Sequence, residues 1–160
     1  MYHETMSTPL FTSLVKPLKG GSYFGAHDAS ITAALQNERD AWAAEFDPNG
    51  TLTEKKTQRD RTSDLHVTVL TPKESRKIDR AEVANVFASD VAFEALGIGR
   101  INDGDNEAWF VVLISPEVQE ARAKLGLPPK DLHATLGFKT KYIFTTPKTE
   151  DTLVLDWRTL

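Results

Sequence analysis

The chain has 160 residues, a hydrophobic fraction of 40%, a charged fraction of 26% and a formal net charge of −4. These values are typical of an ordinary globular protein, and a chain of this length can bury a sizeable core as one domain over residues 1–160 without a metal or disulfide. The chain contains no cysteine, which excludes disulfides, a thiol nucleophile and cysteine-ligated zinc.

Charge and hydropathy also restrict the expected partners and surroundings. The sequence shows no basic stripe of the kind that grips long nucleic acids, so we expect no long duplex as a partner. No stretch approaches the roughly 18 apolar residues of a membrane span, and residues 1–5 lack the features of a signal peptide. We therefore expect a cytoplasmic protein without a membrane partner.

The first elements in chain order are a short strand and a helix. Residues 1–20 are punctuated by proline and glycine and are interpreted only as an N-terminal segment. Residues 22–26 are apolar enough for a short buried strand, and Asp28 can cap the helix after it. Apolar side chains recur at helical spacing from Ile31 to Trp42, which predicts one helix across that region.

A long polar stretch separates this helix from the next strand. Residues 47–63 contain a Pro-Asn-Gly turn and a charged run, and we expect a solvated, mobile loop there. Residues 65–70 then read as a strand that ends at a Thr-Pro pair. A ragged apolar face predicts a helix over residues 73–88.

A hairpin and a capped helix follow. Residues 96–101 and 108–114 have the composition of strands, and the Asn/Asp/Gly-rich residues 102–106 between them are typical of a hairpin turn. Ser115 is a good helix N-cap with proline after it, and Gly126 suits the C-terminal end of that helix.

The last elements repeat the order of the first ones. Residues 132–138 predict a strand, and residues 142–144 and 152–155 predict two more. Both halves of the chain thus read strand, helix, strand over a period too long for a solenoid repeat. The order indicates two similar α+β lobes related by a pseudo-two-fold axis.

One pentapeptide pattern occurs in the last strand of each half. Asp-Leu-His-x-Thr occupies residues 64–68 and again residues 131–135. A second occurrence by chance is on the order of a one-in-a-thousand event at average residue usage. Because residues i and i+2 of a strand share a face, His66 should point with Thr68, and His133 with Thr135.

This pairing suits phosphodiester cleavage. Histidine titrates near neutrality, so one imidazole can take a proton from the attacking oxygen while the other gives one to the leaving oxygen. The hydroxyls of Thr68 and Thr135 can hold the non-bridging oxygens. This scheme requires no metal and no cofactor. We therefore expect His66, His133, Thr68 and Thr135 to be the catalytic residues.

Two other interpretations of the motifs remain. Histidines beside a strand can be purely structural groups, and histidine is also a common zinc ligand. A zinc site needs a third ligand, for which Asp64 and Asp131 are the nearest candidates in sequence. His3 and His27 lie outside the repeats and are given no role.

The two motifs and the order of the elements, over about residues 21–146, make the chain resemble the 2H phosphoesterases. Their signature is a pair of His-x-Thr/Ser motifs on the two lobes of a bilobal α+β fold (LigT-like). The resemblance implies antiparallel sheets that line a central cleft, with helices outside, and a metal-independent phosphodiesterase. Residues 125–138 look most like RNA-repair-like members and like phage nucleases that destroy the cyclic oligonucleotides of CBASS immunity.

A nucleotide substrate would also need a surface on which its base can stack. The candidate substrate-binding residues are aromatic side chains near the expected strands and one lysine beside the second motif: Tyr23, Phe138, Tyr142, Trp157 and Lys139. The alternative for the aromatics is a place in the core. We favour a small linear or cyclic 3′–5′ oligonucleotide, or a 2′,3′-cyclic phosphate, as substrate. A tRNA-repair enzyme and a nucleotide-binding module without turnover are the alternatives.

Overall fold

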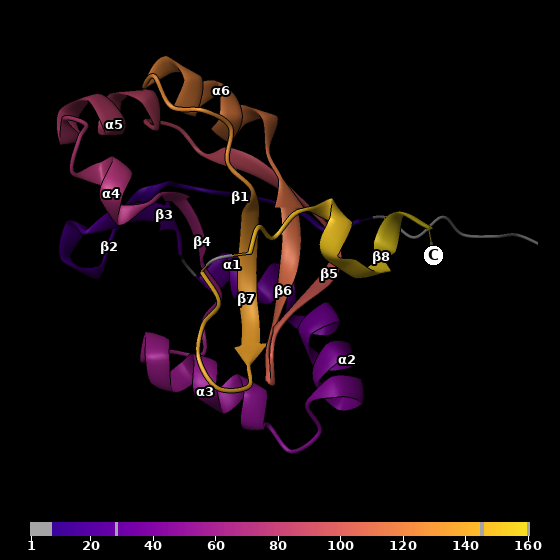
Figure 1. Ribbon diagram of the computed structural model, residues 1–160. Coiled ribbons are helices and arrows are strands. Elements are labelled where there is room, and N and C mark those ends of the chain that lie inside the picture. The colour runs from indigo at the N-terminus through magenta and orange to yellow at the C-terminus, as the bar shows by residue number, and fades with distance from the viewer. Residues whose placement is uncertain (1–7, 28, 145, 160) are drawn as a thin grey trace, which may run out of the picture.

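The computed structural model describes residues 8–27, 29–144 and 146–159, and it has an α+β architecture (Figure 1). The strands are β1 (Leu10–Ser13), β2 (Lys16–Leu18), β3 (Tyr23–Ala26), β4 (Val67–Leu70), β5 (Val91–Asp103), β6 (Asn106–Ile114), β7 (Leu132–Phe138) and β8 (Leu153–Asp156). The α-helices are α1 (Ala29–Ala34), α2 (Gln36–Phe46), α3 (Thr51–Asp60), α4 (Pro72–Ser75), α5 (Arg80–Val86) and α6 (Pro116–Lys124). Short 3₁₀ turns are η1 (Lys19–Gly21), η2 (Glu150–Thr152) and η3 (Trp157–Thr159).

Two curled antiparallel sheets form the framework. One has the strand order β1-β5-β6-β7 with β8 also paired to β5, and the other has the order β2-β3-β4. The two sheets meet where β4 contacts β7. Each of these strands follows the helices of its own half of the chain. Helices α4, α5 and α6 lie toward one end of these strands, and α2 and α3 lie toward the other (Figure 1).

The two sheets contain the same unit twice. Strands β2 and β3 pair antiparallel, helices α1 to α3 follow, and β4 returns to pair antiparallel with β3. Strands β5 and β6 pair antiparallel, α6 follows, and β7 returns to pair antiparallel with β6. The prediction of two pseudo-symmetric α+β lobes with helices outside antiparallel sheets is thereby confirmed.

Alternation along the two returning strands separates core from site. Val67 and Val69 of β4 are fully buried in the main core, as is Ala134 of β7. Thr68 lies between the two valines on β4, and Thr135 follows Ala134 on β7. Both threonines point away from that core, because successive strand residues face opposite sides of the sheet. The core thus holds the two strands rigidly while their other faces carry the motif side chains.

The prediction of a mobile loop over residues 47–63 is wrong, because helix α3 (Thr51–Asp60) occupies most of that stretch. The buried carboxylate of Asp47 starts the helix by accepting hydrogen bonds from the backbone N–H groups of Leu52 and Thr53 and from the Thr53 hydroxyl. Such capping satisfies the free donors of the first turn. The helix packs closely on β7, where the Cβ of any larger residue at Gly137 would lie 2.7 Å from the Leu52 backbone.

The prediction of a strand over residues 142–144 is also wrong, since this segment is irregular. Side chains hold this segment and the residues just before it. The Asn106 side chain binds the Lys141 carbonyl and the Thr140 N–H, and the Lys148 ammonium binds the Ile143 carbonyl.

Other boundaries differ by smaller amounts. The helix expected over residues 73–88 is two helices, because Thr71 caps α4 in a capping box and Asp79 caps a new start at α5. The helix expected from Ile31 to Trp42 is likewise divided into α1 and α2. The strands expected over 65–70 and 152–155 are Val67–Leu70 and Leu153–Asp156. The expected cap at Asp28 lies outside the described residues.

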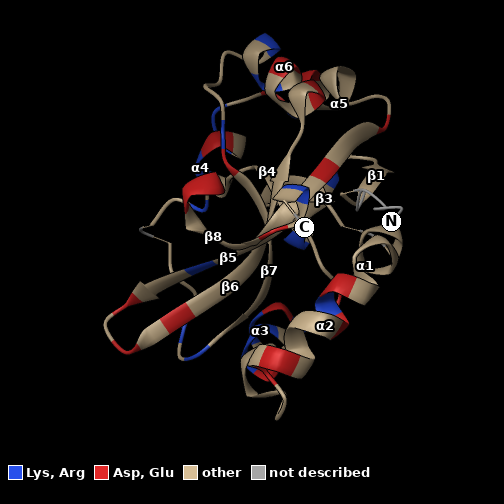
Figure 2. Ribbon diagram, turned by 90° about the vertical axis from the view of Figure 1, so that its right-hand side faces the viewer, with Lys and Arg blue, Asp and Glu red and all other residues tan. Residues whose placement is uncertain are grey.

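The hairpin and the capped last helix are confirmed. Strands β5 and β6 are joined by a tight turn in which Gly104 has a φ of 62°. The Ser115 hydroxyl accepts from the Val118 N–H at the start of α6, and Gly126 after its end has a φ of 77°. In the described ranges, no helix combines the length and apolar character required to span a bilayer. Basic and acidic segments are interspersed on α2, α4 and α6 (Figure 2).

Candidate active site

The two His-x-Thr motifs lie on the strands that join the lobes. His133 and Thr135 are within β7, where they pair with Val112 and Phe110 of β6. His66 immediately precedes β4, and Thr68 lies within it. Both histidines are largely buried, with side-chain exposures of 16% for His66 and 13% for His133.

The imidazole of His66 lies between aromatic rings and a carboxylate. Its ring centroid is 6.3 Å from that of Tyr23 and 6.2 Å from that of His27. Its Nδ1 lies 3.8 Å from Oδ2 of Asp60, at the end of α3. Lys56 of the same helix pairs with Asp60 at 3.3 Å and donates to the Asp64 carbonyl just before the motif. Helix α3 therefore positions the first histidine.

The imidazole of His133 has a similar arrangement built from other residues. Its Nδ1 lies 4.0 Å from Oδ2 of Asp131, and its Nε2 is 2.5 Å from the hydroxyl of Tyr142. The Tyr142 ring is nearly parallel to the imidazole, at 18° between planes, and Thr135 lies close enough to its hydroxyl to lower the pKa of that group. Each Nδ1 thus lies near a carboxylate but beyond hydrogen-bond distance of it, while the Nε2 of His133 meets a tyrosine hydroxyl.

Arg59 connects the two histidines electrostatically. Its guanidinium carbon lies 4.4 Å from the centroid of the Tyr142 ring. Its charge lowers the pKa of both His66 and His133, and the charge of His66 also lowers the pKa of His133. These couplings fall off within about 10 Å in salt solution. Strands β4 and β7 contact each other, so the two histidines lie in the same region of the molecule.

Burial makes both imidazoles neutral at pH 7. Desolvation lowers the pKa of His66 to about 4 despite the opposing charge of Asp60. Desolvation, followed by the charges of Lys148 and Lys130, lowers the pKa of His133 well below its usual value. Burial also lowers the pKa of the Lys148 ammonium to about 8. An anionic substrate would oppose these effects, because negative charge favours the protonated imidazole.

These pKa values predict acid lability above pH 4. In the unfolded chain histidine binds a proton near pH 6.5, whereas folded His66 does so only near pH 4, so stability is lost as the pH falls from 6.5 toward 4. For His66 alone, the free energy of unfolding should fall by about 2 kcal/mol between pH 7 and pH 5. Urea unfolding at several pH values measures this. His66→Gln should flatten the dependence, and an unchanged pH profile in that variant would contradict the assignment.

The residues expected to bind substrate fall into two groups. Tyr23 lies beside His66, Tyr142 beside His133, and the Phe138 ring is 6.3 Å from that of Tyr142. The structure does not bring the other two to the histidines. Lys139 is exposed beyond the end of β7, and Trp157 is buried against a different pocket.

Several residues at the site were not anticipated from the sequence. Arg59 and Asp60 fall in the stretch interpreted as a loop, and Lys148 lies in the unpatterned segment after β7. The Lys56 and Asp60 pair at i and i+4 is a helix signal that was available. For Lys148 no sequence signal was present, because its burial depends on the tertiary fold.

Two cavities adjoin these residues. One of about 110 Å³ is lined by Tyr23, His27, Asp60 and His66 among others. A larger one of about 710 Å³ is lined by Arg59, Phe138, Tyr142 and Phe144, with the basic residues Lys55 and Lys141. Within the described ranges, no three His, Cys, Asp or Glu side chains lie close enough together to hold a metal ion.

Two antiparallel lobes, each with a His-x-Thr motif at the strand where they meet, are the arrangement expected of a two-histidine phosphoesterase. Residues 33–144, which include both motifs, match the family model described as Swiss Army Knife, 2H phosphoesterase domain. The chain belongs to this family, which implies a hydrolase of phosphoesters. Searches of curated proteins and of solved structures each return no match.

Proposed function

We propose that the protein is a metal-independent phosphodiesterase that cleaves small linear or cyclic 3′–5′ oligonucleotides, with His66 and His133 as the acid–base pair. The observation that carries the proposal is the pair of imidazoles at adjoining strands, each with its Nδ1 near a carboxylate. A carboxylate near Nδ1 favours the tautomer with the proton on that nitrogen, which leaves Nε2 as the acceptor. Nε2 of His133 meets the Tyr142 hydroxyl in this structure, so we propose that substrate displaces that hydroxyl when it binds. A cytoplasmic location accords with a substrate of this kind.

The proposed reaction is an in-line displacement at phosphorus. A neutral imidazole accepts the proton of the attacking 2′-hydroxyl or water, a new P–O bond forms, and the bond to the leaving oxygen breaks. The other imidazole gives its proton to that oxygen. It acquires this proton when the anionic phosphodiester enters and raises its pKa. Thr68, Thr135 and Arg59 are proposed to stabilise the negative charge on the non-bridging oxygens.

The larger cavity is lined by Tyr142, the partner of His133, and it supports an oligonucleotide over a mononucleotide. It has a volume of about 710 Å³, and its walls combine Phe144, whose exposure is 76%, with Tyr142 and Arg59. Exposed aromatic rings and nearby cations are the features that stack bases and hold a backbone without reading sequence. We propose that the nucleotide next to the scissile phosphate occupies this cavity.

Tyr142 is proposed to position His133. Burial raises the pKa of its hydroxyl to about 12, so it stays protonated and donates to Nε2 of His133. A hydrogen bond donated to neutral imidazole lowers the pKa of that imidazole. Tyr142→Phe should therefore raise the pKa of His133 and lower kcat by about tenfold. In the pH profile of kcat/KM, the acidic limb moves to higher pH where His133 is the base, and the alkaline limb does so where it is the acid. Steady-state kinetics across the pH range checks this, and an unshifted limb would argue for a purely structural tyrosine.

A panel of substrates in EDTA tests the activity. We expect product from linear and cyclic oligonucleotides and faster turnover of these than of 2′,3′-cyclic mononucleotides. The reverse preference, with activity on RNA ends, would favour the repair-type alternative. Binding without any product would indicate a nucleotide-binding module, and activity lost in EDTA but restored by zinc would refute a metal-independent mechanism.

A further inference from the structure

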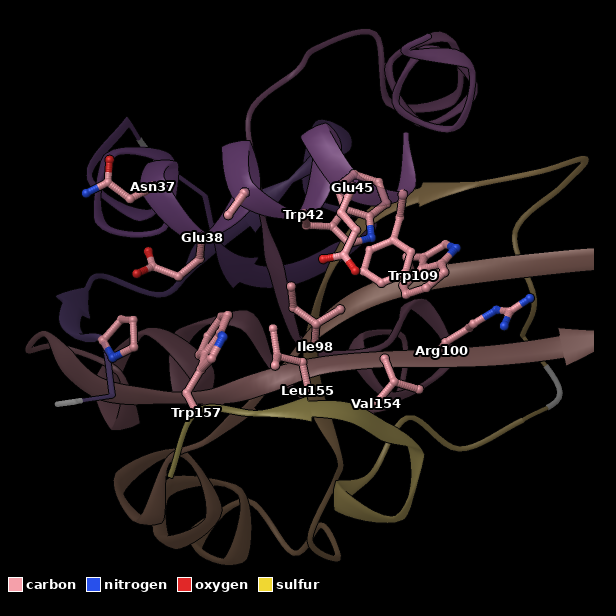
Figure 3. Close-up of a pocket in the computed structure, with 13 residues that line it drawn as sticks. Asn37, Glu38, Trp42, Glu45, Ile98, Arg100, Trp109, Val154, Leu155 and Trp157 are labelled. Carbon is pink, nitrogen blue, oxygen red and sulfur yellow. The ribbon is translucent and has the colours of Figure 1, made fainter. Parts of the chain in front are cut away.

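A further pocket, distinct from the two cavities at the candidate active site, lies on the face of the larger sheet opposite His133. It has a volume of about 500 Å³ and lies between α2 on one side and strands β5 and β8 on the other (Figure 3). Trp109 of β6 pairs with Arg100 of β5, and both line it together with Ile98. His133 pairs with Val112, which lies three residues after Trp109 on β6. Residues an odd number of positions apart on a strand face opposite sides of the sheet, so Val112 and His133 face away from Trp109. This pocket is therefore separate from the candidate active site.

The walls of this pocket are mainly aromatic. The chain has 3 tryptophans, and Trp42, Trp109 and Trp157 all line it together with Phe46. The Trp109 ring centroid is 4.5 Å from that of Phe46 and 6.0 Å from that of Trp42. The volume falls in the range of small-molecule sites, which are mostly apolar with a few placed polar groups.

A cation already contacts one of these rings. The Arg100 guanidinium carbon lies 5.2 Å from the centroid of the Trp109 ring, which is the distance of a cation–π contact. Arg100 is held there by Glu107, with which it forms a 2.9 Å ion pair. Arg100 thus already covers one face of the Trp109 indole, and its charge is balanced by Glu107, so the other rings of the wall are left to meet a ligand.

Two carboxylates flank the aromatic wall on α2. Glu38, Trp42 and Glu45 follow one another at i, i+4 and i+7, which places them on one side of the helix. Figure 3 shows all three side chains reaching from α2 toward the space that Trp157 and Leu155 approach from the opposite side. In the part of the chain that the structure describes, neither glutamate forms an ion pair.

We propose that this pocket binds a small organic cation, a substituted ammonium with an aromatic or alkyl body. The aromatic faces attract the cation, the apolar walls cover its body, and Glu38 and Glu45 supply the opposite charge. Glu45 is exposed and Glu38 is half-buried, so a neutral apolar ligand would gain nothing from either carboxylate, whereas a cation would be attracted by both. The proposal does not depend on the proposed phosphodiesterase activity.

Tryptophan fluorescence tests this directly, because every tryptophan of the chain lines the pocket. Benzyltrimethylammonium titrated into the full-length protein should change the emission to saturation. Its uncharged isostere neopentylbenzene should bind about tenfold more weakly. Glu38→Gln and Glu45→Gln should each weaken binding of the cation severalfold, to about the same degree, and leave turnover of oligonucleotides unchanged. Glu120→Gln, at an exposed position on α6, is the matched control and should have no effect on affinity.

Three results would overturn the proposal. Equal affinity for the charged probe and its isostere would show a merely apolar pocket. Full affinity in both glutamine variants would remove the role of the carboxylates. Emission that changes with protein concentration alone, together with a dimer in sedimentation, would show that a second copy of the chain fills the pocket.

Discussion

Replacement of either His66 or His133 by alanine is expected to lower kcat by roughly 10²–10⁴-fold, because each removes one partner of the acid–base pair. KM should change little, since the aromatic and basic walls of the neighbouring cavity remain. Steady-state kinetics with a dinucleotide substrate measures both parameters. Both variants should fold, because each histidine lies on the face of its strand away from the main core.

Two comparisons make this result specific. The double variant should be scarcely slower than either single variant, because residues that act in one step are not additive. His3→Gln, at a histidine outside the described residues, should retain full activity. A single histidine variant with near-normal kcat would refute the paired mechanism, and equal losses in kcat and folding would indicate a structural role.

The parts of this fold that could be predicted are those specified by local pattern. The hairpin of β5 and β6 follows from its turn residues, and α6 from the Ser115 cap, because both signals act within a few residues. The duplicated order then placed His66 and His133 on equivalent strands. The alternation rule correctly separated Val67 and Ala134, in the core, from the motif side chains.

The parts that could not be predicted depend on contacts between distant segments. Helix α3 has almost no apolar stripe, with a buried Lys56 where a hydrophobic residue is expected. It is stable because Asp47 caps it and because Gly137 of β7 lets it approach closely. Asp47 lies before the helix and Gly137 lies on a distant strand, so no apolar pattern within the helix itself identifies it, and its polar sequence resembled a loop. Lys148 reaches His133 in the same way, through a segment without regular structure.

The two lobes are also less symmetric than their motifs. In the second lobe the carboxylate beside the histidine is Asp131, from the motif itself. In the first lobe the equivalent Asp64 instead accepts a bond from Thr32, and Asp60 of α3 lies beside His66. Helix α3 has no counterpart after β6. The duplicated motif therefore repeats the imidazole in each lobe, while unrelated elements surround it. These different surroundings allow His66 and His133 to have different pKa values.

Replacement of Arg122 by methionine is expected to destabilise the protein by about 3–5 kcal/mol, because it breaks a buried ion pair that joins the lobes. Arg122 of α6 is almost fully buried and donates two hydrogen bonds to Glu74 of the other lobe, at 2.9 and 2.8 Å. It also donates to the Val69 carbonyl of β4 at 2.7 Å. Burial raises the pKa of Glu74, but the bonds from Arg122 and Thr71 outweigh it and hold that pKa below its usual value.

Urea unfolding measures this effect, and two further variants interpret it. Arg158→Met removes an arginine that is also paired with two carboxylates, but on the surface, so its unfolding midpoint should hardly move because solvent screens such pairs. Arg122→Met with Glu74→Gln should recover part of the loss, since no charge is then left unpaired in the interior. A loss confined to the Arg158 variant would contradict the argument. Because Val69 follows Thr68 on β4, partial loosening of this link should also lower kcat before the chain unfolds.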